Sequence, residues 1–255
     1  MSTVSRYEVR ERAAWITLDS PANRNALSGP LVAELGAHLR AALADDAVRA
    51  IVLTGTGPAF CAGADLKNRG DAVAPGGGPN PFVEILRLMW DGPKPVIVAA
   101  NGHAFGGGVG LVAAADVALA VEGATFSFSE VRIGVIPAMI SVVVLPKIGA
   151  NQAMRLFLTG ARFDAREAAG YGLVHHVVAP EGLVAAAEEQ VRAIALGGPI
   201  AVAEAKRLIR TVSRVSMEEG FAYAERKIAA LFASLEAAEG MLAFAQKRKP
   251  SWANA

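Results

Sequence analysis

The sequence has 255 residues, of which 53% are hydrophobic and 19% are charged. A chain of this kind can bury a large apolar core, and its composition excludes intrinsic disorder over most of its length. The 25 Lys and Arg residues nearly balance the 24 Asp and Glu residues, for a net charge of +1. This balance excludes the strongly basic surface typical of a protein whose main partner is nucleic acid or an anionic membrane. An anionic ligand must therefore be bound by Lys or Arg side chains close to its site, because the net charge of the protein does not attract it.

The sequence contains a single cysteine, Cys61, which cannot form an internal disulfide. The first thirty residues also lack the basic, apolar and small-residue zones of a secretory signal, so we expect a protein of the reducing cytosol. The most apolar stretch, residues 95–121, is interrupted by Asn101, His103, Asp116 and several glycines. Because a transmembrane helix needs about 18 consecutive apolar residues, the sequence predicts no membrane span.

The N-terminal region is predicted to form a β-hairpin followed by an amphipathic helix. Residues 7–9 and 14–18 have the alternating pattern of strands and end at an Asp-Ser-Pro turn, which predicts two edge strands. Ser28 is a suitable N-cap for a helix. Apolar residues then recur at every third or fourth position, namely Leu31, Leu35, Leu39 and Ala42 or Leu43. This spacing predicts a helix that packs one face on the core.

Short apolar runs that end in loops predict buried strands in the middle of the chain. Residues 50–54 precede Gly-Thr-Gly-Pro, and residues 95–100 precede Asn-Gly. A tightly packed helix is expected at 106–115, followed by strands at 116–121 and 124–128. Residues 68–80 lack periodic apolar positions and are rich in glycine and proline. They are predicted to form a mobile surface loop that covers a site.

Helices dominate the chain after Asn151. Asp164 and Glu167 have the spacing of a capping box, residues 174–178 are a predicted strand, and residues 181–247 are mostly helical. The Gly-Gly-Pro sequence at 197–199 indicates a hinge. We therefore predict an α/β core over residues 1–196 and a helical C-terminal part over residues 197–255 that serves in assembly.

Three consecutive glycines, Gly106 to Gly108, follow a predicted buried strand and open a predicted helix. Without Cβ atoms in the way, their backbone N–H groups can reach a ligand and stabilise an oxyanion. Close packing of the helix against a strand explains the same glycines. Gly108, Gly110 and Ala113 also satisfy the G-x-G-x-x-A pattern of dinucleotide sites, but further glycines precede the pattern, which makes the match weak.

A second loop at a strand end, FCAGADLK at residues 60–67, again places small residues where a helix is expected to begin. In both loops, small side chains thus leave backbone N–H groups accessible to a ligand.

Glu130 lies in the segment FSFSEVRIGVIP, residues 126–137, whose aromatic and apolar residues predict largely buried surroundings. Burial raises the pKa of a carboxyl group toward neutrality, as a proton shuttle requires. An ion pair with Arg132 would instead keep Glu130 ionised. The residues alone leave both interpretations open.

The histidines and the cysteine do not indicate a metal site, a serine hydrolase or a cysteine nucleophile. His103, His175 and His176 do not have the spacing of zinc ligands, and the sequence contains no G-x-S-x-G motif. We interpret them as loop or surface histidines. Phe60 and Ala62, the neighbours of Cys61, indicate a packed thiol rather than a nucleophile.

Taken together, five motifs resemble those of the crotonase superfamily, the enoyl-CoA hydratase/isomerase family, in the family's order and over nearly the whole chain. They are NALS at 25–28, FCAGADLK at 60–67, NGHAFGGGVGL at 101–111, FSFSEVRIGVIP at 126–137 and FDAREAAGYGLVHHVV at 163–178. The resemblance implies an α/β fold, a spiral of ββα repeats whose C-terminal helices mediate homotrimers or hexamers formed as dimers of trimers. It also implies an acyl-CoA thioester as substrate and no cofactor or metal.

The resemblance assigns a role to individual residues. The backbone amides of Ala64 and Gly107 would hold the thioester carbonyl oxygen, and Glu130 would act as acid/base. The implied substrate contacts are Asp65, Leu66 and Lys67 beside the thioester and pantetheine, Ala26 and Ala62 near the adenine end, and Arg24 and Lys249 at the CoA phosphates.

Gly110 departs from the family pattern, because the best-known hydratases carry the first of two glutamates at this position. Glu130 matches the second. A single carboxylate suffices to move a proton between C2 and C4, as is understood for the family's Δ3,Δ2-enoyl-CoA isomerases.

The motifs GGGVGL and SEVRIGVIPA also resemble a bacterial branch described as hydratases, some proposed for branched substrates such as methylglutaconyl-CoA. We predict a hydratase of fatty acid or related acyl-CoA metabolism, with an isomerase or a catalytically weak acyl-CoA-binding protein as alternatives.

Overall fold

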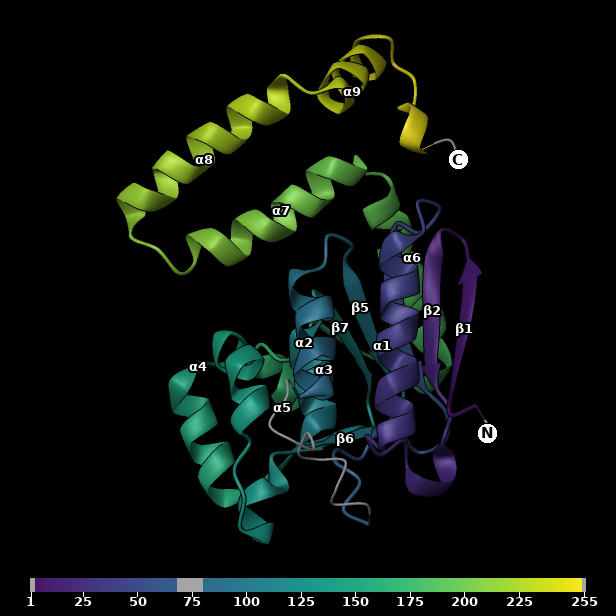
Figure 1. The fold of residues 1–255 in the computed structure, drawn as a ribbon, viewed down its shortest axis with the longest axis vertical. Coiled ribbons are helices and arrows are strands. Elements are labelled where there is room, and N and C mark those ends of the chain that lie inside the picture. Colours follow the sequence, from purple (N-terminus) through teal and green to yellow (C-terminus); the bar gives the residue numbers. More distant parts are fainter. Residues whose placement is uncertain (1–2, 68–79, 254–255) are drawn as a thin grey trace.

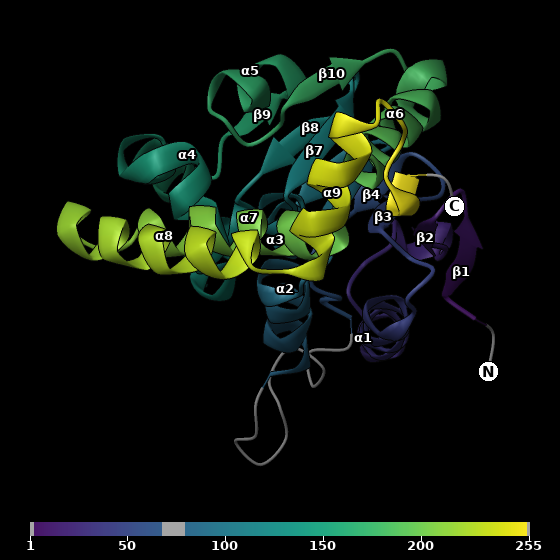
Figure 2. The same cartoon turned by 90° about the horizontal axis from the view of Figure 1, so that it is seen from above.

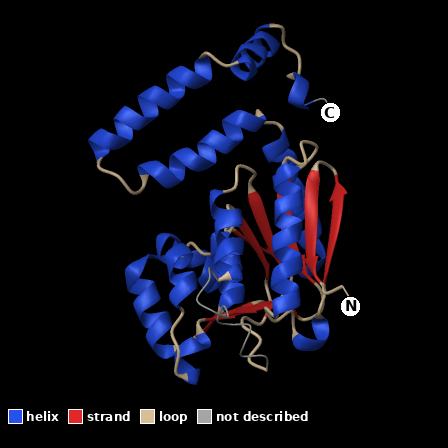
Figure 3. Cartoon of the chain, viewed as in Figure 1, coloured by secondary structure: helices blue, strands red, loops and turns tan. Residues whose placement is uncertain are grey.

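The computed structural model describes residues 3–67 and 80–253. In this part of the chain, two β-sheets are surrounded by helices, and three C-terminal helices extend from one end of the molecule (Figures 1 and 3).

The chain begins with the predicted hairpin, in which β1 (Ser5–Arg10) pairs antiparallel with β2 (Ala13–Leu18). Helix α1 (Gly29–Ala44) follows, and Ser28 caps it by accepting a hydrogen bond from the Leu31 N–H. The side chains predicted to face the core are buried, namely Leu31, Leu35, Leu39 and Ala42. The prediction of two edge strands was wrong for β2, because a parallel partner, β3 (Ala50–Gly55), covers its other side.

The middle of the chain repeats a long strand, a short strand and a helix. The repeats consist of β3, β4 (Ala59–Cys61) and α2 (Pro81–Asp91); of β5 (Val96–Ala100), β6 (His103–Phe105) and α3 (Gly107–Ala114); and of β7 (Val117–Val121), β8 (Thr125–Ser127) and α4 (Ala138–Thr159). Among the described residues, the long strands form a six-stranded sheet with β10 (His176–Val178) at one edge, in the order β1-β2-β3-β5-β7-β10. The short strands form a four-stranded sheet with β9 (Arg162–Asp164), in the order β4-β6-β8-β9. The ββα repeat implied by the family resemblance is confirmed.

The repeats are followed by β9 (Arg162–Asp164), α5 (Ala165–Gly170), β10 (His176–Val178) and α6 (Leu183–Ala195). The predicted capping box is present, since Asp164 and Glu167 each accept a hydrogen bond from the other's backbone N–H. Figure 2 shows α1 and α2 on one side of the strands and α6 on the other. The larger sheet is therefore covered on both faces, which explains why its central strands consist almost entirely of buried apolar residues.

The parallel strands direct several loops to one edge of the fold. β3 pairs with β5, and β5 pairs with β7, all in the same direction. The chain therefore leaves these strands on the same side, where it enters the short strands β4, β6 and β8. This arrangement brings together loops that lie far apart in the sequence.

The C-terminal helices are α7 (Pro199–Val212), α8 (Met217–Phe232) and α9 (Leu235–Ala245). Figure 1 shows them at the end of the molecule opposite β6. Helix α7 is joined to the core through Asp116, whose carboxylate binds Lys206 at 2.8 Å and Arg210 at 2.5 Å. The division of the chain into two domains at residue 196 stays a prediction.

No single helix in the described part of the chain has both the length and the apolar character needed to cross a membrane. Helices α8 and α9 meet those criteria of length and composition only as a pair, and the pair is bent by 67°.

Two predictions for the region after β4 have different outcomes. Residues 66–67 form a turn, so the motif at 60–67 does not open a helix as expected. The loop predicted at 68–80 lies outside the described residues except for Asn80, which is the N-cap of α2 and accepts a hydrogen bond from the Phe82 N–H at 2.9 Å.

Candidate functional site

The short strands place three loops side by side. β4 pairs with β6 through Cys61 and Ala104, and β6 pairs with β8 through Ala104 and Phe126. All three strands run in the same direction, so the loops that follow them leave the sheet together. These loops carry Ala64, Gly107 and Glu130 respectively.

Gly63 and the backbone after β6 are in close contact. An ideal Cβ atom on Gly63 would lie 2.6 Å from the Phe105 carbonyl oxygen and 3.3 Å from the backbone nitrogen of Gly107. Gly63 also has a φ angle of +85°, which L side chains rarely adopt. Only glycine satisfies both demands, and its presence lets the loop that carries Ala64 approach Gly107.

The amides of Ala64 and Gly107 are not used by the fold. Gly107 is the first residue of α3, where N–H groups lack partners within the helix, and its N-cap, Gly106, provides no side chain. Ala64 forms a bridge with Leu27 in which the Leu27 N–H, at 2.8 Å, donates to the Gly63 carbonyl. Within residues 3–67 and 80–253, neither the Ala64 nor the Gly107 N–H has a hydrogen-bond acceptor. Both are available to an oxygen atom of a ligand.

The glycines of this region have two different roles. Gly106 has a φ angle of +51° and turns the chain from β6 into α3. Gly108 and Gly110 lie inside α3 and allow close packing, because a Cβ atom on them would collide with Cys61 and Ile140, respectively. The dinucleotide interpretation needed these two glycines to face a ligand, and they face protein atoms instead.

Glu130 lies beside the glycine turn. It belongs to a 3-10 helix, Ser129–Ile133, and its Oε1 atom is 3.1 Å from the position that a Cβ atom on Gly106 would take. In the part of the chain that the structure describes, the buried Oε2 atom has no hydrogen-bond partner. Desolvation by burial raises the pKa of this carboxyl group above its ordinary value, whereas a hydrogen bond from its own backbone lowers it.

Arg132 does not form the ion pair that was the alternative explanation for Glu130. Its guanidinium group instead faces the carbonyl oxygen of Thr159 at 3.4 Å. The apolar residues expected to bury Glu130 were partly misassigned, since Ile133, Val135 and Ile136 are exposed. The 3-10 turn breaks the strand-like alternation after Phe128. The carboxylate itself lies beside Gly106.

The structure brings several of the other expected contacts to the same loops. Arg24 is exposed, and its carbonyl oxygen accepts a hydrogen bond from the Ala62 N–H at 3.0 Å. Ala26 is buried next to the bridge between Leu27 and Ala64. Residues 24–27 therefore run alongside residues 62–64.

The residues after Ala64 form an exposed turn. The Asp65 Oδ1 atom accepts a hydrogen bond from the Lys67 N–H at 3.0 Å, and Leu66 is exposed over 55% of its surface. Because this turn directly follows Ala64, these side chains border the candidate site. Their contacts with a substrate stay a prediction.

Lys249 is not brought to these loops within one chain. It follows α9, in a segment whose Trp252 carbonyl accepts a hydrogen bond from Arg12 at 2.5 Å. Arg12 precedes β2, at the end of the sheet opposite the loops of the candidate site. The expected role of Lys249 at the CoA phosphates stays a prediction.

Comparisons with known proteins identify the family of this chain. A family model described as enoyl-CoA hydratase/isomerase matches residues 8–255. The chain is 38% identical over 245 residues to the carnitinyl-CoA dehydratase of Salmonella arizonae, covering 93% of each chain. It is 39% identical over 243 residues to a Rhizobium meliloti protein named probable enoyl-CoA hydratase, covering 95% of each. The chain belongs to the enoyl-CoA hydratase/isomerase family.

Solved structures of this family share the fold along the whole chain. The crystal structure of enoyl-CoA hydratase from Bacillus anthracis has a TM-score of 0.90 and 32% sequence identity, with 99% of this chain and 100% of the other covered. A crotonase from Legionella pneumophila also has a TM-score of 0.90, at 34% identity and with 98% and 99% covered. The crotonase-like α/β fold is thereby confirmed.

Sequence reasoning did not single out Asn25, a buried residue that joins the loops of this family member. Its Oδ1 atom accepts a hydrogen bond from the Ser20 N–H at 2.8 Å. Its Nδ2 atom donates to the carbonyl oxygens of Thr56 at 3.0 Å and Ala59 at 2.9 Å. Asn25 therefore ties the segment before α1 to the turn between β3 and β4. A polar residue inside the apolar NALS context was the available signal.

Three further residues at the site were missed, namely Gly63, Phe82 and Ile140. Phe82 of α2 lies 3.4 Å from the Cβ position of Gly107 and 3.8 Å from that of Gly110. Ile140 of α4 contacts the same Cβ position of Gly110. No local motif marks either side chain, because both reach α3 from other parts of the chain.

Two of the histidines and the cysteine interact with other parts of the protein. The Nδ1 atoms of His103 and His175 accept hydrogen bonds from the backbone N–H groups of Thr125 and Ala118. His176 lies in β10. Cys61 is fully buried, and burial raises the pKa of its thiol to about 12. The interpretation of Cys61 as a packed thiol is confirmed.

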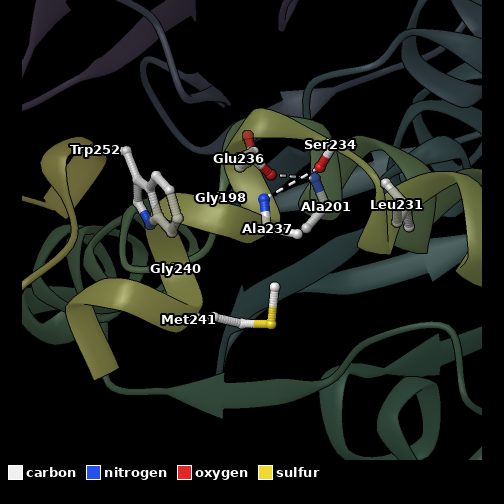
Figure 4. Close-up of a pocket in the computed structure, with 9 residues that line it drawn as sticks. All are labelled: Gly198, Ala201, Leu231, Ser234, Glu236, Ala237, Gly240, Met241 and Trp252. Atoms are coloured by element: carbon white, nitrogen blue, oxygen red, sulfur yellow. Dashed lines mark hydrogen bonds between the residues drawn. The ribbon is translucent and has the colours of Figure 1, made fainter. Parts of the chain in front are cut away.

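Two hollows lie away from these loops. One, of about 280 Å³, lies among α7, α9 and the C-terminal segment, and Figure 4 shows Trp252 and Met241 on its wall. Its carboxylate, Glu236, accepts hydrogen bonds from the N–H groups of Ile200 and Ala201 and thus caps α7. The other, of about 470 Å³, lies beside β1 and includes His38. Neither contains the free amides or the carboxylate described above.

Proposed function

We propose that this family member is an enoyl-CoA hydratase, which adds water across the C2–C3 double bond of a 2-enoyl-CoA thioester and catalyses the reverse dehydration. The observation that carries the proposal is the pair of unused amides, Ala64 and Gly107, in adjoining loops beside the Glu130 carboxyl group. The Salmonella relative named carnitinyl-CoA dehydratase and the Bacillus structure named enoyl-CoA hydratase support the same reaction type.

The two amides would act on the thioester carbonyl. When water adds at C3, negative charge moves onto the carbonyl oxygen and forms an enolate. Backbone donors fixed in advance stabilise this charge more strongly in the transition state than in the bound substrate. The N-terminus of α3 adds a favourable dipole at Gly107. Loss of one such donor typically costs about 3–4 kcal/mol of transition-state stabilisation.

Glu130 would make the proton transfers. As a carboxylate it accepts a proton from water while the hydroxyl oxygen bonds to C3, and it then returns that proton to C2. The reaction is balanced with one carboxyl group, which must change protonation state readily near neutral pH. The raised pKa of Glu130 favours this role.

The remaining contacts are proposed from the family resemblance. Arg24 and Lys249 would meet the CoA phosphates, and the backbone around Ala62 and Ala26 would lie near the adenine. Asp65, Leu66 and Lys67 would border the thioester and pantetheine. We also propose a cytoplasmic homotrimer, or a hexamer of two trimers, that needs no cofactor.

Gly110 favours a second candidate function, Δ3,Δ2-enoyl-CoA isomerisation. In this reaction Glu130 removes a proton from C2 of a 3-enoyl thioester and returns it at C4, without water. A single carboxyl group suffices, and the absence of a side chain at position 110 is compatible with it.

The candidates differ in their substrates. The purified protein would be incubated with crotonyl-CoA and, separately, with 3-hexenoyl-CoA while the absorbance of the conjugated enoyl thioester is followed. Loss of absorbance with crotonyl-CoA supports the hydratase, and a gain with 3-hexenoyl-CoA supports the isomerase. Tight binding of both esters without turnover would contradict both enzymes and favour an acyl-CoA-binding protein.

A further inference from the structure

The segment from Glu130 to Ile140 faces two glycines on one helix. Gly106 and Gly110 are one turn apart on α3, since the Gly110 N–H donates to the Gly106 carbonyl at 3.2 Å. Glu130 occupies the space beside Gly106, and Ile140 occupies the space beside Gly110. A carboxyl group and a β-branched sec-butyl side chain thus face positions about 5–6 Å apart along the helix axis.

Ile140 leaves no room for a side chain at position 110. An ideal Cβ atom on Gly110 would lie 2.9 Å from the Ile140 Cβ atom and closer still to its Cγ2 atom. Ile140 is 3% exposed and lies in the first turn of α4. Because a β-branched residue in a helix has essentially one rotamer, Ile140 cannot swing away as the end of a long side chain would.

The wall around this position is apolar. Phe82 completes it from α2, where the ring is 8% exposed and its Cζ atom is 3.8 Å from the Cβ position of Gly110. The three atoms nearest to the Cβ position of Gly110 are therefore all carbon atoms of apolar side chains.

We infer that Ile140 is a specificity-determining residue, because it fills the space that a side chain at position 110 would need. It thereby keeps a second acid away from Glu130. One carboxyl group is left to make every proton transfer. The inference rests on the proposed function, because it concerns the proton transfers of that reaction. It adds that the absence of a second acid is enforced by packing and not merely by the identity of residue 110.

The steric part is tested by a double-mutant cycle in thermal unfolding. Gly110→Ala should lower the unfolding midpoint by roughly 3–10 °C, as expected for overpacking in a chain of this size. In the Ile140→Ala background, the same change should lower it less, because the closest atom, Cγ2 of Ile140, is removed and only the Cβ atom at 2.9 Å remains. Val144→Ala is the matched control, since it truncates a buried side chain of α4 that comes no closer than 3.8 Å to the Cβ position of Gly110. An equal effect of Gly110→Ala in all three backgrounds would overturn the inference.

The chemical part is tested with Gly110→Glu in the wild-type and Ile140→Ala backgrounds. In the Ile140→Ala background, where the Cγ2 contact is removed, the new carboxyl group should add a second ionisation to the pH profile of kcat/KM. It should also raise the rate of hydration relative to isomerisation by about tenfold or more, because a second carboxylate can hold the water. In the wild-type background, Gly110→Glu should unfold at a lower temperature and show no such gain.

Two outcomes contradict the chemical part. The first is a Gly110→Glu variant that keeps the wild-type midpoint and gains the second ionisation without any change at Ile140. The second is a folded Gly110→Glu/Ile140→Ala variant whose pH profile and product ratio equal those of Ile140→Ala. If the wild-type protein turns over neither acyl-CoA ester, the proposed function fails, whereas the unfolding cycle still judges the packing of Ile140 against Gly110.

Discussion

Gly63 is the residue at which the two amide-bearing loops approach each other. Its missing Cβ atom would lie 2.6 Å from the Phe105 carbonyl oxygen, and its φ angle of +85° disfavours any side chain. Gly63→Ala should therefore push the Ala64 loop away from Gly107. A displacement of about 1 Å at a reacting centre typically costs about a hundredfold in rate.

Steady-state kinetics with crotonyl-CoA would measure this change, which should appear mainly in kcat because the amides act on charge that develops in the transition state. Gly123→Ala is a matched control, since no atom lies within 4 Å of its Cβ position and its φ angle is not positive. A Gly63→Ala enzyme with the kinetics of Gly123→Ala would contradict the positioning of the amides.

The burial that suits Glu130 to its proposed catalytic role carries a cost in stability. Desolvation raises the pKa of its carboxyl group in the folded protein above the ordinary value of 4.5. The folded state therefore binds this proton more tightly than the unfolded state does. Below pH 4.5 the group is protonated in both states, and as the pH rises through 4.5 and then through the folded pKa, the free energy of unfolding falls.

Glu130→Gln should abolish this pH dependence while removing the acid/base. We expect a loss of at least about a hundredfold in turnover. The unfolding midpoint of the variant should rise relative to that of the wild type between pH 4 and pH 7, because the amide is never ionised. Differential scanning calorimetry across this range would measure it. A difference between the two midpoints that stays constant with pH would show that Glu130 is not desolvated as described.

The Asp116 carboxylate joins two cationic side chains of helix α7 to the core. Asp116 accepts hydrogen bonds from Lys206, from Arg210 and from the Val96 N–H at 2.8 Å. Arg210 also stacks on Trp90, with its guanidinium carbon 4.1 Å from the ring centroid. The side chains of Lys206 and Arg210 are largely buried, so each needs the opposite charge.

Asp116→Asn should destabilise the fold by about 3 kcal/mol, because it removes the carboxylate that is in contact with two buried cations. Urea unfolding would measure this loss. Glu84→Gln removes the partner of Arg40 in an exposed ion pair and should cost less than about 1 kcal/mol. Equal losses in the two variants would contradict the anchoring role of Asp116.

Elements with a regular apolar period were predictable from the sequence, and elements with an interrupted period were not. Helix α1 shows its buried face at Leu31, Leu35 and Leu39, and this prediction was confirmed. Helix α4 was missed because Pro146 lies inside it and Gly149 kinks it with a φ angle of +71°. Helix α2 was overlooked although its buried residues are regularly spaced.

The site was predictable only as far as its local motifs extend. The amides and Glu130 lie in loops that the family resemblance marks, and the order of the short strands brings those loops together. The contact of Ile140 with Gly110 joins two helices across the fold, so no sequence window contains it. The end of the sheet that Lys249 occupies likewise follows from long-range packing rather than from its neighbours.

Across the whole molecule, apolar side chains are buried in the core and exposed on the C-terminal helices. Helix α8 has no buried residue in the single chain. Its most exposed large apolar side chains are Met217, Phe221, Ile228 and Phe232. Their spacings of 4, 7 and 4 residues place them on one face of the helix. A continuous apolar stripe of this kind is typical of a surface that another protein covers.

We expect this stripe to be covered in the homotrimer or hexamer that the family resemblance implies. Sedimentation velocity should then give a mass three or six times that of one chain. Replacement of Phe221 and Phe232 by Arg should shift the protein to smaller species, because charge on a buried apolar surface is strongly unfavourable. Arg226→Glu changes the charge on the opposite face of α8 and should leave the mass unchanged. A wild-type protein that sediments as a monomer at micromolar concentration would contradict the assembly. If the double replacement leaves the mass unchanged, the interface does not lie on α8.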